Sequence, residues 1–173
     1  MQAEQANVVD SSPVPVAYVS IPRGEIVKLV ALGLVVGLLV PLGTSLLTTY
    51  FIEPVFCRAD GGVMGICSSG GVIANHIAAV VIAVAAFAVM TRWGIYRALL
   101  LAVASTLALW GLQKYAASLT TGYWLEYYLF SALLYGLAYM SFYWLLRLKN
   151  FVASLVLCIA LVVAVCVVMV VAT

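Results

Sequence analysis

Long apolar segments, separated by a few charged residues, determine what this chain can fold into. Five such segments are present, at residues 29–50, 72–90, 98–117, 125–146 and 151–172. Charges enter them only near an end, as Lys114 does in the third segment and Glu126 in the fourth. Each segment approaches the roughly 20 residues that a helix needs to cross a hydrocarbon core. The spacing therefore predicts an all-α fold, a polytopic transmembrane helical bundle of five transmembrane helices.

The composition agrees with a surface that faces lipid. Only 8% of the 173 residues are charged, and 66% are hydrophobic. About a quarter of the residues of a soluble domain are charged, because its surface must face water. Membrane lipids are therefore the expected surroundings of this chain. The net charge of +2 and the lack of a basic run argue against a nucleic-acid partner.

The first 22 residues differ from the rest. Residues 1–22 show no helical apolar period and contain Pro13 and Pro15, which predicts a mobile cytoplasmic tail before a bundle that covers 23–173. Alternatively, the first apolar segment is a signal peptide that is cleaved at residues 42–44. A signal peptide has an apolar core of about 7–15 residues, and this segment is longer. A signal-anchor helix is the better interpretation.

The positions of the Lys and Arg residues predict the orientation. With five crossings, six of the eight fall on one side of the membrane and two on the other. The six are Arg23, Lys28, Arg92, Arg97, Arg147 and Lys149, and the two are Arg58 and Lys114. Basic residues collect on the cytoplasmic side. We therefore expect a cytoplasmic N-terminus and an external C-terminus.

Cys57 and Cys67 fall in the first external loop of this topology. Thiols outside the cytoplasm oxidise to disulfides, and the glycines between these two let the loop turn back. The pattern predicts a Cys57–Cys67 disulfide. Redox chemistry is the alternative, but it normally uses a Cys-x-x-Cys pair, which this loop lacks. Free thiols are the third possibility.

From the remaining cysteines and the histidine we expect no metal site and no cofactor. Cys158 and Cys166 lie among Val, Leu and Ala in the last segment, where thiols behave as small hydrophobic groups. His76 is the one histidine of the chain, and a zinc site needs three or four ligands. We expect His76 to be a partly buried residue that hydrogen-bonds to a neighbouring helix. A role as an external pH sensor is the alternative.

Lys114 and Glu126 flank the loop between the third and fourth segments, on the external side. Charges at such positions commonly extend to the interface. The sharper interpretation is an external ion pair that joins the two helices. Tyrosines and tryptophans around them suggest an aromatic belt at the level of the headgroups.

Two helix faces suggest how the bundle packs. Gly33 and Gly37 form a small-xxx-small pair in the first segment, which allows two backbones to approach closely in lipid. Packing within one chain is the simpler interpretation, and homodimerisation is the alternative. The fourth segment carries a stripe of hydroxyl and aromatic side chains that we expect to point inward. Its members are Tyr128, Ser131, Tyr135, Tyr139 and Phe142. The last segment has few polar residues and suits the periphery.

Three functional hypotheses follow. None of the segments has an Asp, Glu, Lys, Arg or His near its middle, which argues against an ion-coupled transporter. The first hypothesis is a non-enzymatic membrane subunit or scaffold that packs against other membrane proteins or itself. The second is a transporter or flippase of an apolar or lipid-linked substrate that uses a tyrosine-lined groove. The third is an enzyme at the outer interface that uses His76, Glu126 and Lys114. An external disulfide without an organelle signal favours the bacterial cytoplasmic membrane over a eukaryotic secretory membrane.

Overall fold

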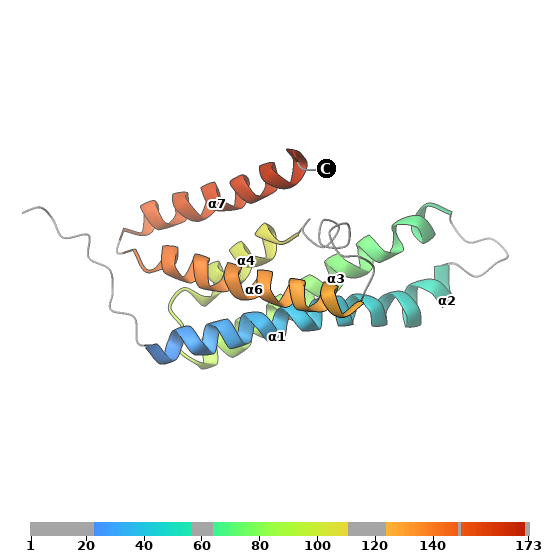
Figure 1. Ribbon diagram of the computed structural model, residues 1–173, viewed down its shortest axis with the longest axis horizontal. Helices are drawn as coiled ribbons and strands as arrows, with labels where there is room; N and C mark the ends of the chain where they lie inside the picture. Colours follow the sequence, from blue (N-terminus) through green and yellow to red (C-terminus); the bar gives the residue numbers. More distant parts are fainter. Residues whose placement is uncertain (1–22, 57–63, 111–123, 149, 172–173) are drawn as a thin grey trace, which may run out of the picture.

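The chain folds into an all-α bundle of apolar helices, as the segments predict (Figure 1). The computed structural model describes residues 23–56, 64–110, 124–148 and 150–171. The elements are α1 (Arg23–Leu47), the π-helix η1 (Thr48–Ile52), α2 (Glu53–Phe56), α3 (Met64–Arg92), α4 (Ala98–Ala108), α6 (Trp124–Leu146) and α7 (Phe151–Val171). Four helical stretches are long and apolar enough to cross a membrane, and α4 is a shorter apolar helix. The chain is therefore a membrane protein.

Two helices extend beyond their apolar segments. The first starts at Arg23, before the predicted residue 29, and continues through η1 and α2 to Phe56. Likewise, α3 starts at Met64, so the backbone of Cys67 is helical. The prediction that Cys67 lies in a loop is therefore wrong. The physical reason is that hydropathy marks the part of a helix inside hydrocarbon, whereas a helix can continue into the polar headgroup region.

The closest contact in the bundle joins α1 to α6, which run antiparallel (Figure 1). A Cβ atom on Gly33 would lie 2.8 Å from the Cα of Gly136, and one on Gly37 would lie 2.5 Å from the Cα of Ala132. Small residues on both helices thus let the two backbones touch. The structure places Gly33 and Gly37 against a helix of the same chain, which is the simpler of the two interpretations.

The core lies beside this contact. The inward-facing stripe of α6 is confirmed for four of its five members, because Ser131, Tyr135, Tyr139 and Phe142 are buried, whereas Tyr128 is half-buried. The buried Ser105 hydroxyl of α4 donates to the carbonyl oxygen of Leu101 at 2.8 Å. A hydroxyl buried in lipid needs such a partner.

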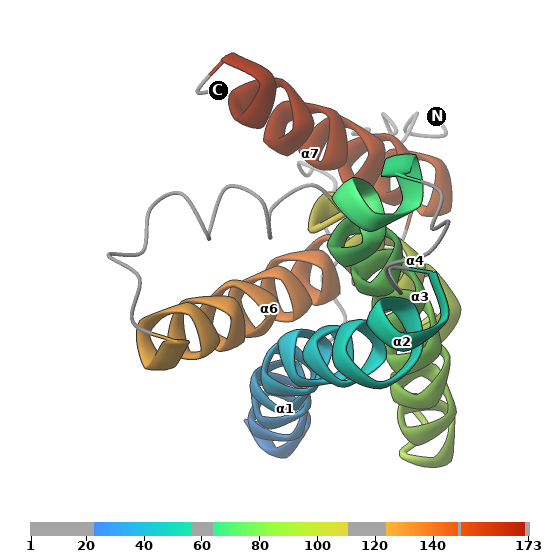
Figure 2. The same ribbon diagram turned by 90° about the vertical axis from the view of Figure 1, so that its right-hand side faces the viewer.

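In Figure 2, α3 and α4 lie to one side of α1, and α7 lies on the side of α6 away from α1. Helix α3 packs on α1 and α4, and α7 packs on α4 and α6. Thr44 of α1 and Asn75 of α3 link their helices, with 3.2 Å between Oγ1 and Oδ1. Only 11% of the apolar window of α7 is buried, against 44% for α6. The expectation that the last helix is peripheral is therefore confirmed.

Filling the α1–α6 contact tests this packing. We expect Gly37→Ala to lower the free energy of unfolding by about 2 kcal/mol, because the new methyl group would overlap α6 backbone. Thermal unfolding of the purified protein in mild detergent measures the loss. Gly71→Ala is the matched control, since a Cβ atom there would have no neighbour within 4 Å. A Gly37→Ala protein that unfolds normally but changes its oligomeric state would instead assign this face to a second copy.

Candidate functional site

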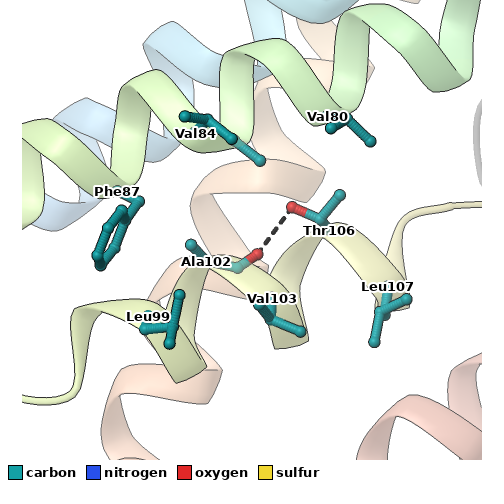
Figure 3. A pocket seen from close by; sticks show the side chains of 9 residues that line it. Val80, Val84, Phe87, Leu99, Ala102, Val103, Thr106 and Leu107 are labelled. Carbon is teal, nitrogen blue, oxygen red and sulfur yellow. Dashed lines mark hydrogen bonds between the residues drawn. The ribbon is translucent and has the colours of Figure 1, made fainter.

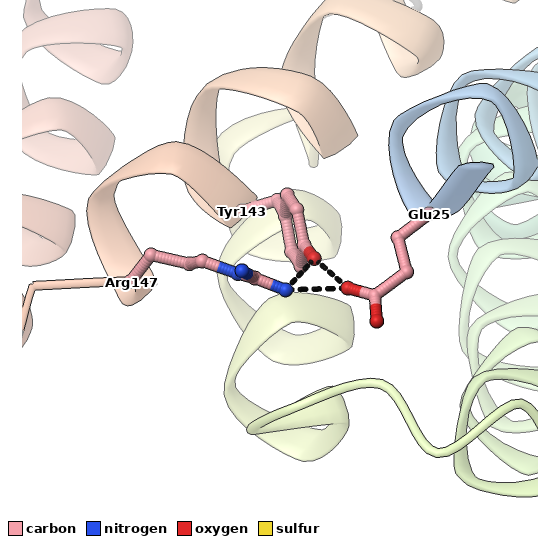
Figure 4. Close-up of polar contacts among 3 residues, drawn as sticks. All are labelled: Glu25, Tyr143 and Arg147. Atoms are coloured by element: carbon pink, nitrogen blue, oxygen red, sulfur yellow. Dashed lines mark hydrogen bonds and ion pairs between the residues drawn. The ribbon is translucent and has the colours of Figure 1, made fainter. Parts of the chain in front are cut away.

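A carboxylate, a phenol and a guanidinium meet where α1 begins and α6 ends (Figure 4). Glu25 lies in the first turn of α1, where the helix dipole favours a negative charge. Tyr143 and Arg147 are four residues apart and therefore share one face at the end of α6. Tyr143 Oη and Arg147 Nη2 both donate to Glu25 Oε2, and Arg147 Nη2 also contacts Tyr143 Oη. The ion pair thus fixes the end of α6 to the start of α1.

The burial of this pair is uneven. The Arg147 side chain is 7% exposed, whereas that of Glu25 is 33% exposed. A guanidinium so far from water requires a neutralising partner. The Tyr143 ring also lies next to the guanidinium, with its centroid 4.9 Å from Arg147 Cζ. Glu25 is therefore the anion that neutralises Arg147.

Arg97 forms a second junction at the same end. It directly precedes α4. Its φ of 55° lies in the left-handed region, which residues other than glycine rarely adopt. Its Nη1 donates to the carbonyl oxygen of Leu146 at 3.3 Å, which satisfies one of the free carbonyls at the end of α6. Its Cζ lies 4.7 Å from the ring centroids of both Tyr96 and Phe151. Arg97 therefore joins α4, α6 and the start of α7.

We call this part of the bundle the arginine end, defined by Arg92, Arg97 and Arg147. The start of α1, the turn from α3 to α4 and the turn from α6 to α7 all lie there (Figure 1). Sequence reasoning placed these cations on one side but missed the Glu25–Arg147 pair. The signal was available, because an antiparallel α1 and α6 must bring residue 25 near the end of the fourth segment.

His76 contacts a neighbouring helix through its ring. It stacks on Trp110, which follows α4, with 4.5 Å between ring centroids and 15° between ring planes. This stack is a contact across the bundle, and the expected hydrogen bond of His76 stays a prediction. In the described part of the chain, no three His, Cys, Asp or Glu side chains are grouped to hold a metal ion.

Three of the other predicted site residues lie, wholly or with their side chains, outside the described residues. These are Cys57, the side chain of Cys67, and Lys114. The disulfide and the Lys114–Glu126 pair therefore stay predictions. Glu126 lies in the first turn of α6 and is exposed. Cys158 is buried and Cys166 exposed, and both are free thiols.

Apolar grooves lie between adjacent helices. The groove between α3 and α4 has a volume of about 220 Å³ (Figure 3). Its lining residues are Val80, Ala83, Val84, Phe87, Leu99, Ala102, Val103, Thr106 and Leu107. The one hydroxyl among them, that of Thr106, donates to the carbonyl oxygen of Ala102 at 2.7 Å. This groove therefore presents almost no free polar group and suits an apolar occupant. Two further grooves lie between α4 and α7 and between α1 and α3.

Removing one member of the ion pair should destabilise the protein more than removing both. We expect Glu25→Gln to lower the free energy of unfolding by roughly 2 kcal/mol, because Arg147 is left with a buried, unpaired charge. The loss is smaller than for a fully buried pair because Glu25 is partly exposed. Adding Arg147→Met should restore part of the loss. Thermal unfolding of the three proteins in detergent provides the comparison.

Lys28→Gln is the control for this cycle, since Lys28 is an exposed cation near the start of the same helix. Its melting temperature should match that of the unmodified protein. Strictly additive losses for the single and double variants would show that Glu25 and Arg147 act independently, contrary to the geometry.

Comparison with known proteins adds no relative to this picture. A scan against protein-family models, a search of curated proteins and a search of solved structures each found no match. A functional proposal must therefore be built from the residues of this chain, its grooves and its charged end.

Proposed function

We propose that the chain is a non-enzymatic subunit or scaffold of a membrane assembly. The carrying observation is the groove between α3 and α4, which is apolar, opens at the surface of the bundle and has small residues in its lining. Ala83 and Ala102 leave room there for the side chains of another transmembrane helix, and close packing is what stabilises helix pairs in lipid. The occupant in this proposal is a helix of a partner membrane protein.

The division of labour among the helices supports this proposal. The glycine face of α1 is already occupied by α6, and Glu25 and Arg147 pair with each other. These contacts hold the chain together and leave α3 and α4 with an unfilled apolar surface. A partner helix that fills the α3–α4 groove gains dispersion contacts without having to match a charge.

The proposal includes an orientation. The arginine end faces the cytoplasm, because Arg and Lys collect on that side of a membrane. This leaves the C-terminus external and favours the bacterial cytoplasmic membrane. Cys57 and Cys67 then face an oxidising space and form a disulfide, and Lys114 and Glu126 pair at the external interface.

A transporter or flippase of an apolar or lipid-linked substrate is the alternative. It was based on a groove lined by the tyrosines of α6. Tyr135 and Tyr139 are instead buried among other core side chains, and the three grooves described above are lined by none of the α6 tyrosines. The subunit proposal therefore has the stronger support.

Reporter fusions test the orientation. A periplasmic alkaline phosphatase fused after Thr173 should be active, and a fluorescent protein that folds only in the cytoplasm should be active after Lys149. The two positions are expected on opposite sides of the membrane because α7 crosses it once between them. A cytoplasmic reporter that is active at Thr173 would contradict the odd number of crossings.

The same cells report on the disulfide. Thiol labelling read by mass spectrometry should modify Cys57 and Cys67 only after reduction, because an external bridge blocks both. Labelling of both cysteines without reductant would remove the bridge from the proposal.

Site-specific photo-crosslinking tests the subunit role. A photoreactive phenylalanine at Val84, in the α3–α4 groove, should give one discrete crosslinked protein in cells. The same residue at Val152 is the control, because Val152 is 66% exposed, close to the 62% of Val84, but lines none of the three grooves. The two sites therefore differ in location and not in access.

A second pair of variants links the crosslink to the groove. Ala83→Leu should abolish the Val84 crosslink because it fills the groove, whereas Ala85→Leu on the same helix should not. A product of twice the chain mass would identify a second copy as the partner. Crosslinks to lipid alone at Val84 would overturn the proposal and favour the transporter or flippase.

A further inference from the structure

The groove between α4 and α7 differs from the others in having a fixed cation at one end. Its volume is about 240 Å³. Its lining is apolar, and consists of Leu100, Val103, Ala104, Leu107, Leu146, Leu155, Cys158, Ile159, Val162 and Val163. Leu100 and Leu155 each lie about one helical turn beyond Arg97 and Phe151, the residues that meet at the arginine end. Arg97 does not line the groove but donates to the carbonyl oxygen of Leu146, which does, so the groove starts close to this guanidinium and continues into the apolar part of the bundle.

The guanidinium of Arg97 is held in place but not saturated. The Tyr96 and Phe151 rings and the Leu146 carbonyl fix its position. An arginine has five N–H donors, and the described residues accept a hydrogen bond from Nη1 alone. The unusual φ of Arg97 indicates that the fold keeps the side chain here at some cost. A pre-positioned cation with free donors is suited to a phosphate.

The charges around Arg97 favour an anionic ligand. Arg92 and Lys28 are exposed at the same end, and Arg147 is already neutralised by Glu25. The other described acids, Glu53 and Glu126, belong to α2 and α6 at the opposite end. The described part of the arginine end thus carries an excess of positive charge.

A buried hydroxyl lies one turn farther along α7. Ser154 is completely buried, and its Oγ has no hydrogen-bond partner among the described residues. Ser154 shares the inward face of α7 with Phe151 and Cys158, at spacings of three and four residues. Buried polar groups are nearly always paired. Ser154 does not line the groove, so a ligand there would be held by Arg97 and the apolar walls and not by this hydroxyl.

We propose that this site binds one anionic phospholipid from the leaflet at the arginine end. The phosphate pairs with Arg97, and one acyl chain lies along the α4–α7 groove. The phosphate of a phospholipid lies in the headgroup region at the end of the bundle, so it can pair with Arg97 without an anion being buried for that purpose. A partner helix in the same groove would cover the free N–H groups of Arg97 and would have to supply a buried anion of its own.

Native mass spectrometry of the full chain, purified in mild detergent, tests this proposal. The protein is mixed with equal amounts of phosphatidylglycerol and phosphatidylcholine that carry the same acyl chains. We expect preferential retention of one phosphatidylglycerol. Arg97→Gln should reduce this preference about fivefold, which corresponds to the attraction of one basic side chain near an anionic headgroup. Arg92→Gln removes the same charge away from the groove and should keep the preference.

The groove is tested separately, in case Arg97→Gln disturbs the fold. Val163→Phe fills the far part of the groove and should remove most of the retained phosphatidylglycerol. Val156→Phe is the matched control, because the two valines are 54% and 58% exposed and only Val163 lines the groove. Equal retention by these two variants would overturn the proposal. Equal losses in Arg92→Gln and Arg97→Gln, or retention of added fatty acid with no phospholipid, would do so as well.

Discussion

The backbone contact between α1 and α6 is the constraint on which the rest of the bundle depends. In lipid, helices gain nothing by hiding apolar side chains from water, so the fit between backbones decides which helices pair. Gly33 meets Gly136 and Gly37 meets Ala132, which fixes an antiparallel register. Glu25 precedes Gly33 by eight residues, and position 144, eight residues after Gly136, lies between Tyr143 and Arg147. The register set by two glycines therefore brings the ion pair together.

The hydroxyl groups of the bundle mostly serve its own helices. Serine and threonine side chains donate to carbonyl oxygens one turn earlier, which satisfies them without a partner helix. Such bonds are Thr44 to Val40, Thr48 to Thr44, Ser105 to Leu101 and Thr106 to Ala102. The contacts left to join helices are then shape, ring stacking and the few polar links at the ends. A surface built this way recognises neighbours by packing, which is the basis of the subunit proposal.

The sequence was sufficient to predict the helices but not their lengths or pairing. Apolar segments between charges located all five, because hydrocarbon excludes charges. The start of α3 was missed because Met64 precedes the apolar segment and lies in a helix that continues outward. The face of α1 with Gly33 and Gly37 was correctly singled out. Its partner was not, since a small-xxx-small pattern does not say which helix it meets.

The residues of the charged end illustrate the same limit. Arg97 and Arg147 were read from sequence as two of six equivalent cations, yet their environments differ. Arg147 is buried against Glu25, whereas Arg97, near an apolar groove, donates to the described residues through Nη1 alone. That difference depends on the backbone turns that precede α4 and α7, and counting charges in the sequence does not reveal how those turns place each arginine. It also separates two roles, since a neutralised cation can only hold helices together, whereas an unsaturated one can also bind. Arg97 lies where α7, the least buried helix, joins the bundle, so a ligand there would stabilise the helix that the chain itself holds most weakly.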